Sequence, residues 1–294
     1  MFDPRIPYQR RMWHYESDRA LSVAQLVALG SIDARTAALL WLLIERHQSL
    51  IVSGPTDPTP GVGKTTTLNA LLGVLPAGTT LVYTLGMYED FEFRNEVQPE
   101  TTCVLANEVS DHLRIYMWGR VARRLLRLPE ENYAVATSCH ADTVQDVLSM
   151  LTRDLRLPAV DVRRLGVIVN IGLVGRLWPP QRRFLTVNFV APTPSDSGDE
   201  DEIRLLPLAT WDSAADTFLP ASQETLAELA AVVGMPLAEF CAALDRRRTR
   251  MEELSRGRGV GVKVMRDAAD ALAATEHGEM VITGDSSSSD HEDE

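Results

Sequence analysis

The segment SGPTDPTPGVGKTTT, residues 53–67, places the tightest constraint on how this chain can fold. It ends as a phosphate-binding loop ends, in glycine, lysine and threonine. It lies between a short apolar run, LIVS at 50–53, and a helical pattern, TTLNALLGVL at 66–75. Such a loop needs a strand that turns directly into a helix, because loop N–H groups and the helix N-terminus must face one anion together. The sequence therefore predicts a strand–loop–helix unit within an α/β fold.

The loop departs from the G-x-x-x-x-G-K-[ST] pattern at one point. Pro58 stands five positions before Gly63, where the pattern has its first glycine. Removal of DPTP, residues 57–60, would restore the pattern with Gly54 in that place. Four extended residues span up to about 13 Å, so this insert can bulge outward while both halves of the loop keep their places. The expected phosphate-binding residues are Gly54, Thr56, Gly61, Val62, Gly63, Lys64, Thr65 and Thr66.

Lys64 gives the loop additional weight. The chain has 27 arginines and only two lysines, Lys64 and Lys263, so a lysine directly after Gly63 is an uncommon event. Lys64 would reach the β- and γ-phosphates, and the hydroxyl of Thr65 would bind Mg²⁺. The alternative is a plain turn that caps a helix, which the strand before the loop and the helix after it disfavour.

Composition excludes some classes of function. The net charge of −12 disfavours nucleic-acid binding through bulk charge, and acidic runs at 198–202 and 285–294 are typical of a solvated loop and tail. The three cysteines have no metal-ligand spacing and suit a reducing compartment. No apolar run approaches the roughly 20 residues of a membrane span, and the first residues do not resemble a signal peptide. We expect a cytoplasmic protein.

Apolar runs alternate with helical patterns along the rest of the chain. Continuously apolar strands separated by helices indicate a parallel sheet covered on both faces. We expect strands at 50–53, 80–84, 102–106, 133–137, 167–174, 184–190 and 203–208. We expect helices from Ser31, at 66–75, along the arginine-bearing stretch 120–127, and from about Thr143, where Asp142 and Gln145 have capping-box spacing.

The composition divides the chain into four expected parts. Residues 1–30 form a basic and aromatic extension without regular structure, and residues 31–220 form the α/β domain. Residues 221–274 have helical periodicity without strand patterns and are expected to form a small helical subdomain. Residues 275–294 are expected to be a disordered acidic tail.

Three further groups of residues are candidates for catalysis. Glu108 follows an apolar strand and can orient water or Mg²⁺, although an acid at a helix start is the alternative. His140 follows the next strand and could contact a γ-phosphate, or could be a helix-capping or exposed histidine. Glu89 and Glu92 lie in an acidic stretch that could supply a general base or form a solvated loop.

The order of these segments resembles the motor ATPases of type II and type IV secretion, type IV pili and archaella. GPT…GVGKTTTLNALL, YEDFEF, LANEVSD and ATSCHAD correspond in order to the family's Walker A loop, Asp box, Walker B segment and His box. The resemblance covers roughly residues 21–255. It implies a RecA-like P-loop NTPase with a mostly parallel central sheet, late antiparallel strands and a small C-terminal helical region.

The resemblance also implies roles for individual residues. Lys64 and Thr65 would belong to Walker A, Glu108 to Walker B with a water-mediated contact to Mg²⁺, and His140 to the His box. Glu89 or Glu92 would be the Asp-box acid, although one ungapped alignment places Gly86 and Met87 at the acidic pair. Of the arginines that the family's N-terminal domain contributes, we expect only the basic stretch around Arg10, Arg11 and Arg19 to be represented.

Three hypotheses for function follow. The first is an ATP–Mg²⁺-dependent motor subunit that forms a ring, usually a hexamer, on a membrane platform of a secretion or pilus-like machine, at the inner face of the membrane. The second is a degenerate relative that binds nucleotide, or none, and serves as a scaffold. The third, a nucleic-acid-dependent RecA-type ATPase, fits poorly with the acidic composition.

Overall fold

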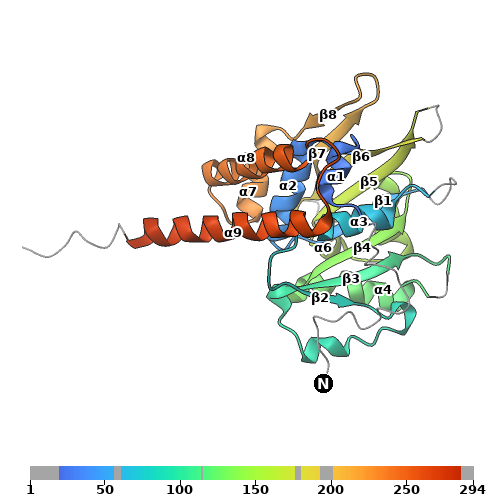
Figure 1. Ribbon diagram of the computed structural model, residues 1–294. Helices are drawn as coiled ribbons and strands as arrows, with labels where there is room; N and C mark the ends of the chain where they lie inside the picture. Colours follow the sequence, from blue (N-terminus) through green and yellow to red (C-terminus); the bar gives the residue numbers. More distant parts are fainter. Residues whose placement is uncertain (1–19, 56–60, 114, 176–179, 193–200, 286–294) are drawn as a thin grey trace, which may run out of the picture.

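The computed structural model describes residues 20–55, 61–113, 115–175, 180–192 and 201–285, with side chains described up to residue 276. The DPTP insert, most of the expected N-terminal extension with its arginines, and residues 286–294 of the expected tail lie outside these ranges. The described part of the chain packs around one twisted sheet (Figure 1).

The described residues form an eight-stranded sheet with the order β2-β3-β4-β1-β5-β6-β7-β8. Strands β2 to β5 pair in parallel along this order, and β6, β7 and β8 are added antiparallel. The predicted α/β class, with a mostly parallel centre and late antiparallel strands, is confirmed; β8 was not predicted. The strands are β1 Leu50–Gly54, β2 Thr80–Tyr83, β3 Thr102–Val109, β4 Ala134–His140, β5 Val167–Val174, β6 Gln181–Val190, β7 Leu205–Asp212 and β8 Thr217–Pro220.

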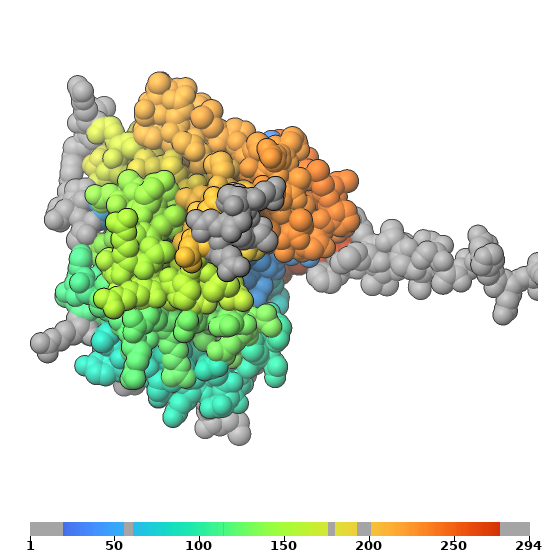
Figure 2. Space-filling view, turned by 180° about the vertical axis from the view of Figure 1, so that it is seen from behind, coloured from blue at the N-terminus to red at the C-terminus, as the bar shows by residue number. Residues whose placement is uncertain are grey.

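Helices cover both faces of the sheet. The α-helices are α1 Val23–Ala28, α2 Ala34–Glu45, α3 Lys64–Leu72, α4 Gly119–Leu126, α5 Val144–Ser149, α6 Ala159–Val162, α7 Gln223–Val232, α8 Leu237–Leu254 and α9 Val262–Asp285. One apolar core lies between the sheet and α1, α2, α3, α7, α8 and the start of α9, and a second lies against α4, α5 and α6. Viewed from behind, residues of the central part of the chain cover the face, and the C-terminal helices lie to one side (Figure 2).

Strand β1 shows how the pleat divides these cores. Leu50 and Val52 belong to the first core and Ile51 to the second, and all three are at least 98% buried. Alternate residues point to opposite faces of a strand, so an unbroken apolar run is the pattern that a doubly covered strand requires. The apolar run at 50–53 thus positions the phosphate-loop segment at the centre of the sheet.

Several helix starts differ from the expectation by one to three residues. Helix α2 is capped by Asp33, which accepts a hydrogen bond from the Thr36 amide, rather than by Ser31. Helix α5 is capped by Thr143, which forms a capping box with Asp146 rather than with the predicted pair. Adjacent polar residues offer competing caps, and tertiary packing decides among them.

Two regions contain more helix than the sequence suggested. Helix α1 lies within residues 1–30, which were expected to be irregular, and Ser22 and Gln25 form its capping box. This S-x-x-Q spacing before an apolar run was a readable signal. Helix α9 extends to Asp285, beyond the boundary expected at residue 274.

No single helix in the described ranges is long and apolar enough to cross a membrane; α7 and α8, which meet at a bend of 102°, pass that test only as a pair.

A buried ion cluster ties the C-terminal helices to the rest of the domain. Arg247 of α8 is 2% exposed, and its Nη2 lies 2.6 Å from Oε2 of Glu45 on α2 and 2.7 Å from Oε2 of Glu276 on α9. Its guanidinium also lies 5.7 Å from the ring centroid of Trp41. The cluster therefore joins three helices through one cation.

We expect Arg247→Met to destabilise the protein by about 3–5 kcal/mol, because removal of the cation leaves the mostly buried carboxylate of Glu45 without a cationic partner, while Glu276 keeps its contact with Arg246. Arg250→Met is the matched control: Arg250 forms an exposed pair with Glu253 at 2.9 Å, and such pairs contribute about 1 kcal/mol or less. Urea denaturation of both variants measures the difference. Equal stabilities of the two variants would contradict the assignment.

Candidate nucleotide-binding site

The end of strand β1 is shaped for a close backbone approach. A Cβ on Gly54 would lie 2.7 Å from the carbonyl oxygen of Ile171 and 3.1 Å from a methyl group of Val62. Only glycine fits there without displacement of the backbone of β5. Gly54 is also paired in register with His140 on β4, so the outer glycine of the loop and the candidate histidine are direct neighbours.

The inner half of the loop joins directly onto helix α3. Gly63 has φ of +100°, a left-handed conformation that favours glycine, and is the residue before the first turn of α3. Lys64 begins the helix, and Thr65 and Thr66 are exposed on its first turn. The strand–loop–helix arrangement is therefore present. Thr56 and the DPTP insert lie outside the described residues, so their contribution stays a prediction.

The ammonium group of Lys64 is held inside the loop. Its Nζ donates hydrogen bonds to the carbonyl oxygens of Gly54 at 3.4 Å and Pro55 at 3.2 Å, and lies 3.0 Å from Nδ1 of His140. Burial lowers the pKa of Lys64, and the charge of Glu108 opposes that effect. The lysine is thus positioned at the loop mouth with carbonyl and imidazole groups as its partners.

Glu108 and His140 meet at the same point from neighbouring strands. Glu108 lies inside β3, whereas the sequence placed it just past the strand end, and β4 separates β3 from β1. The ladder between β3 and β4 is irregular at Asn107, whose carbonyl accepts a hydrogen bond from the Ser138 hydroxyl at 2.9 Å. Such a bulge re-aims the following side chain. At this bulge, the Glu108 carboxylate extends from β3 to His140 on the neighbouring strand β4.

One oxygen of Glu108 has no hydrogen bond within the described part of the chain. Nε2 of His140 lies 2.7 Å from Oε1 of Glu108, a contact that does not have hydrogen-bond geometry. Burial raises the pKa of Glu108, while the nearby Lys64 lowers it. A buried carboxylate oxygen without a donor is unfavourable, so this position suits a water molecule or a cation-bound water.

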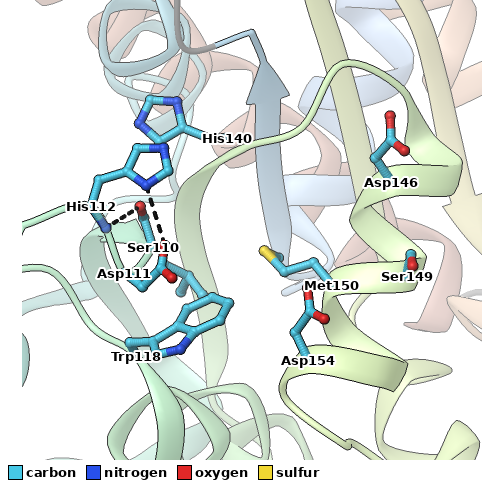
Figure 3. Close-up of a pocket in the computed structure, with 10 residues that line it drawn as sticks. Ser110, Asp111, His112, Trp118, His140, Asp146, Ser149, Met150 and Asp154 are labelled. Carbon is cyan, nitrogen blue, oxygen red and sulfur yellow. Dashed lines mark hydrogen bonds and ion pairs between the residues drawn. The ribbon is translucent and has the colours of Figure 1, made fainter.

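His140 is electrically neutral over the physiological range. Burial, together with the charge of Lys64 and the neighbouring His112, lowers its pKa to about 4. Its Nδ1 therefore accepts from the Lys64 ammonium, and its proton resides on Nε2. The ring is stacked on that of His112, with centroids 4.6 Å apart (Figure 3).

The sequence analysis did not single out His112. It lies in the loop between β3 and α4, which closes on itself because the Met117 amide donates to the Glu108 carbonyl and the Ser110 amide donates to the Met117 carbonyl, each at 3.0 Å. His112 Nδ1 lies 3.2 Å from Asp111. The spacing of four positions from Glu108 to His112 was a weak signal, because the ring stack depends on how this loop folds.

A cavity of about 670 Å³ opens beside the two histidines. Figure 3 shows the histidines, Ser110 and Trp118 on one side and the segment that follows β4 on the other. That segment continues from α5 into a π-helical turn, Met150–Asp154. The cavity is lined by Val109, Ser110, Asp111, His112, Trp118, His140, Asp146, Ser149, Met150 and Asp154.

The two Asp-box candidates are not among these residues. Both carboxylate oxygens of Glu89 accept backbone hydrogen bonds, from Leu85 at 2.8 Å and from Phe91 at 2.7 Å. Burial raises the pKa of Glu89, and these backbone donors oppose the shift. Glu92 is exposed at the start of a short 3₁₀ segment, Glu92–Asn95. No contact found among the described residues joins either side chain to Lys64, Glu108 or His140.

Gly86, which one alignment placed at the acidic pair, has a structural reason to be glycine. Its φ is +62°, and a Cβ there would lie 1.9 Å from the carbonyl oxygen of Ile115. An acidic residue would require the loop between β3 and α4 to move. This position therefore serves loop packing.

Arg182 is a second residue that the sequence analysis missed. Its Nη2 donates to the carbonyl oxygen of Gly61 at 3.0 Å. It comes from strand β6, whose sequence QRRF offers two consecutive arginines without any sign of which one faces the loop. With Gly61, Gly63 and Thr66 it borders a second cavity of about 250 Å³.

The residues present fit a Mg²⁺–nucleotide. The loop provides a positive-φ glycine before a helix N-terminus, a buried lysine and an exposed Thr65 hydroxyl, and Glu108 has an oxygen without a donor. No group of three or more His, Cys, Asp or Glu side chains within the described ranges could hold a metal by itself. Magnesium commonly keeps water and phosphate oxygens as most of its ligands, so it does not need such a cluster.

The neutrality of His140 can be measured by NMR titration of its ring protons in the nucleotide-free protein. We expect no titration near pH 6.5, because burial and the Lys64 charge favour the neutral ring. Lys64→Met should raise the pKa of His140, yet leave it below 6.5, because burial remains the largest cause. A wild-type ring that titrates near 6.5, or that is unaffected by Lys64→Met, would contradict this geometry.

Comparison with known proteins supports the sequence resemblance in part of the chain. Residues 15–90 match the family model described as Type II/IV secretion system protein. An uncharacterised protein of Methanocaldococcus jannaschii is 43% identical over 56 residues, which are 19% of this chain and 9% of that protein. The chain thus spans a small part of that relative's length.

The fold was also compared with solved structures. The crystal structure of the VirB11 ATPase from the Brucella suis type IV secretion system, in complex with sulphate, aligns with a TM-score of 0.38 and 20% identity. The alignment covers 62% of this chain and 59% of that one. The family model ends before Glu108 and His140, so it bears on the loop and the acidic stretch alone. The predicted resemblance is supported there: residues 15–90 of this chain are similar to the type II/IV secretion system protein family.

Proposed function

We propose that this chain binds and hydrolyses ATP with Mg²⁺. The observation that carries the proposal is the meeting of Lys64, Glu108 and His140, which come from α3, β3 and β4, at the loop that follows β1. Ligands of open α/β sheets collect at the carboxyl ends of parallel strands. A buried lysine, a buried acid and a neutral histidine at this edge are arranged for an anionic ligand and a water molecule.

Each residue has a distinct role in this proposal. The amides of Gly61 to Thr66 and the N-terminus of α3 would hold the phosphates, and Lys64 would exchange its carbonyl and imidazole partners for phosphate oxygens. The Thr65 hydroxyl would bind Mg²⁺, which neutralises charge on the phosphate oxygens. When Lys64 leaves Nδ1 of His140, that nitrogen loses its donor, so the histidine senses the occupancy of the loop.

Glu108 is the acid best placed to orient the attacking water. It is buried at the loop with an unpaired oxygen, whereas both oxygens of Glu89 already hold backbone amides and Glu92 is exposed. A carboxylate whose pKa is raised by burial is a better proton acceptor than an exposed one. We therefore assign to Glu108 the role for which the Asp-box acids were candidates.

The motor role rests on the family match. We propose that hydrolysis drives conformational change in a ring, with six subunits as the expected number, docked on a membrane platform at the inner face of the membrane. The exported cargo or fibre would be set by that platform. The match of residues 15–90 to the family model supports this proposal.

A second candidate function is a nucleotide-binding or scaffold module with little turnover. The observation that favours it is the set of contacts that hold Lys64, with two carbonyl oxygens and one imidazole nitrogen, which a phosphate would have to displace. The DPTP insert within the loop points the same way. Binding without turnover would identify this second function.

Lys64→Ala should weaken ATP–Mg²⁺ binding by roughly 10- to 150-fold, because a charge-assisted hydrogen bond contributes about 1.5–3 kcal/mol. Lys263→Ala is the matched control, since the chain's other lysine is 89% exposed on α9 and pairs with Asp267. Isothermal titration calorimetry measures both. If the wild type fails to bind, or if both variants bind equally well, the nucleotide site is wrong.

Glu108→Gln should lower ATP turnover about 100- to 10,000-fold, the range of a general base, with binding retained. Glu92→Gln should leave turnover unchanged because its side chain is exposed. A phosphate-release assay on both variants, alongside Glu89→Gln, checks the assignment. Turnover that depends on Glu89 or Glu92 and survives in Glu108→Gln would move the base back to the Asp box.

A further inference from the structure

Arg182 lies against the flank of the phosphate loop. In the antiparallel ladder it pairs with Leu173 of β5, the strand beside β1, so β6 carries it to the open side of Gly61. Its Nη2 donates to the Gly61 carbonyl at 3.0 Å. Its Cδ and Nε each lie 3.4 Å from the point that a Cβ on Gly63 would occupy. The side chain therefore runs along the loop from its helix end to its mouth.

The neighbouring Arg183 shows what a structural arginine looks like here. Arg183 is 5% exposed and is bound through Nε and Nη2 to both oxygens of Asp216, each at 2.9 Å. Arg182 is exposed and, among the described residues, its side chain has no acidic partner and one hydrogen bond, to a neutral carbonyl. A guanidinium has five N–H donors, so most of those on Arg182 are available to a ligand.

Position and charge point to one class of ligand. Arg182 shares a cavity of about 250 Å³ with Gly61, Gly63 and Thr66 of the loop and with apolar side chains that include Leu21 and Phe184. Guanidinium groups match phosphate oxygens in shape and bind them through two parallel hydrogen bonds. The neutral carbonyl of Gly61 is a weaker hydrogen-bond acceptor for the Arg182 guanidinium than a phosphate oxygen would be.

We infer that Arg182 is a phosphate-binding residue of this chain's own nucleotide site, on the side of the loop opposite His140. The inference rests on the proposed nucleotide function. Lys64 from inside the loop and Arg182 from its outer flank then hold the phosphate chain between two cations. Strand β6 would then supply an arginine to the site. The sequence resemblance had led us to expect such an arginine from the N-terminal residues.

The test compares Arg182→Gln with Arg120→Gln, which removes the same charge from an exposed position on α4. Calorimetry with Mg²⁺–ATP, Mg²⁺–pyrophosphate and adenosine as separate probes should show Arg182→Gln weaker by roughly 10- to 100-fold for the first two. Adenosine, which has no phosphate, should bind both variants alike. Arg182→Lys should recover part of the loss, because it keeps the charge but not the two-pronged geometry.

The outcomes separate this inference from the function on which it rests. If the wild type binds ATP, Lys64→Ala weakens it, and Arg182→Gln matches Arg120→Gln, then the nucleotide site stands and the role of Arg182 falls. If Arg182→Gln weakens adenosine as much as pyrophosphate and lowers the melting temperature, Arg182 only braces Gly61, and the inference also falls. If the wild type binds neither nucleotide nor pyrophosphate, the proposed function itself fails.

Discussion

The hydrogen bonds of the Lys64 ammonium organise the candidate site. One buried cation bridges the end of β1, through the carbonyls of Gly54 and Pro55, and the end of β4, through the imidazole of His140. Its positive charge lowers the pKa of His140 and counteracts the burial that raises the pKa of Glu108. Removal of this charge would raise the pKa of both partners together, because the three groups interact within a poorly solvated space.

The same contacts set what a phosphate would have to displace. A phosphate must replace two carbonyl partners and one imidazole partner of Lys64, and these groups then lose their donor. Binding is therefore coupled to the state of His140 and, through the 2.7 Å contact, to Glu108. In the proposed function, this coupling would link occupancy of the loop to the acid that we assign to orient water.

The sequence predicted the centre of this arrangement because its causes are local. An unbroken apolar strand, a glycine-rich loop and a helix follow one another at residues 50–72, and parallel strands bring Glu108 and His140 to one edge. The cap of α2 was misplaced from Asp33 to Ser31, since neighbouring polar residues compete for the same amides. The burial of both faces of the sheet was predicted from the hydrophobicity of the strands alone.

The remaining parts depend on loops and long-range register, which residue patterns do not reveal. Both oxygens of Glu89 bind amides of its own loop, a contact that the acidic stretch alone does not reveal. Arg182 reaches Gly61 only because β6 pairs with β5 in one particular register, and a shift by one residue would present Arg183 instead. His112 meets His140 only when the loop after β3 closes.

The central claim is that the inner half of the loop, Gly61 to Thr66, binds phosphate despite the insert beside it. Titration of the isotopically labelled protein with Mg²⁺–ATP, followed through backbone amide NMR shifts, tests this claim most directly. The account predicts that the largest shifts fall on the amides of Gly61 to Thr66, with a parallel change in the ring signals of His140 as Lys64 leaves it. Shifts that are absent, or that lie elsewhere in the molecule, would contradict the account.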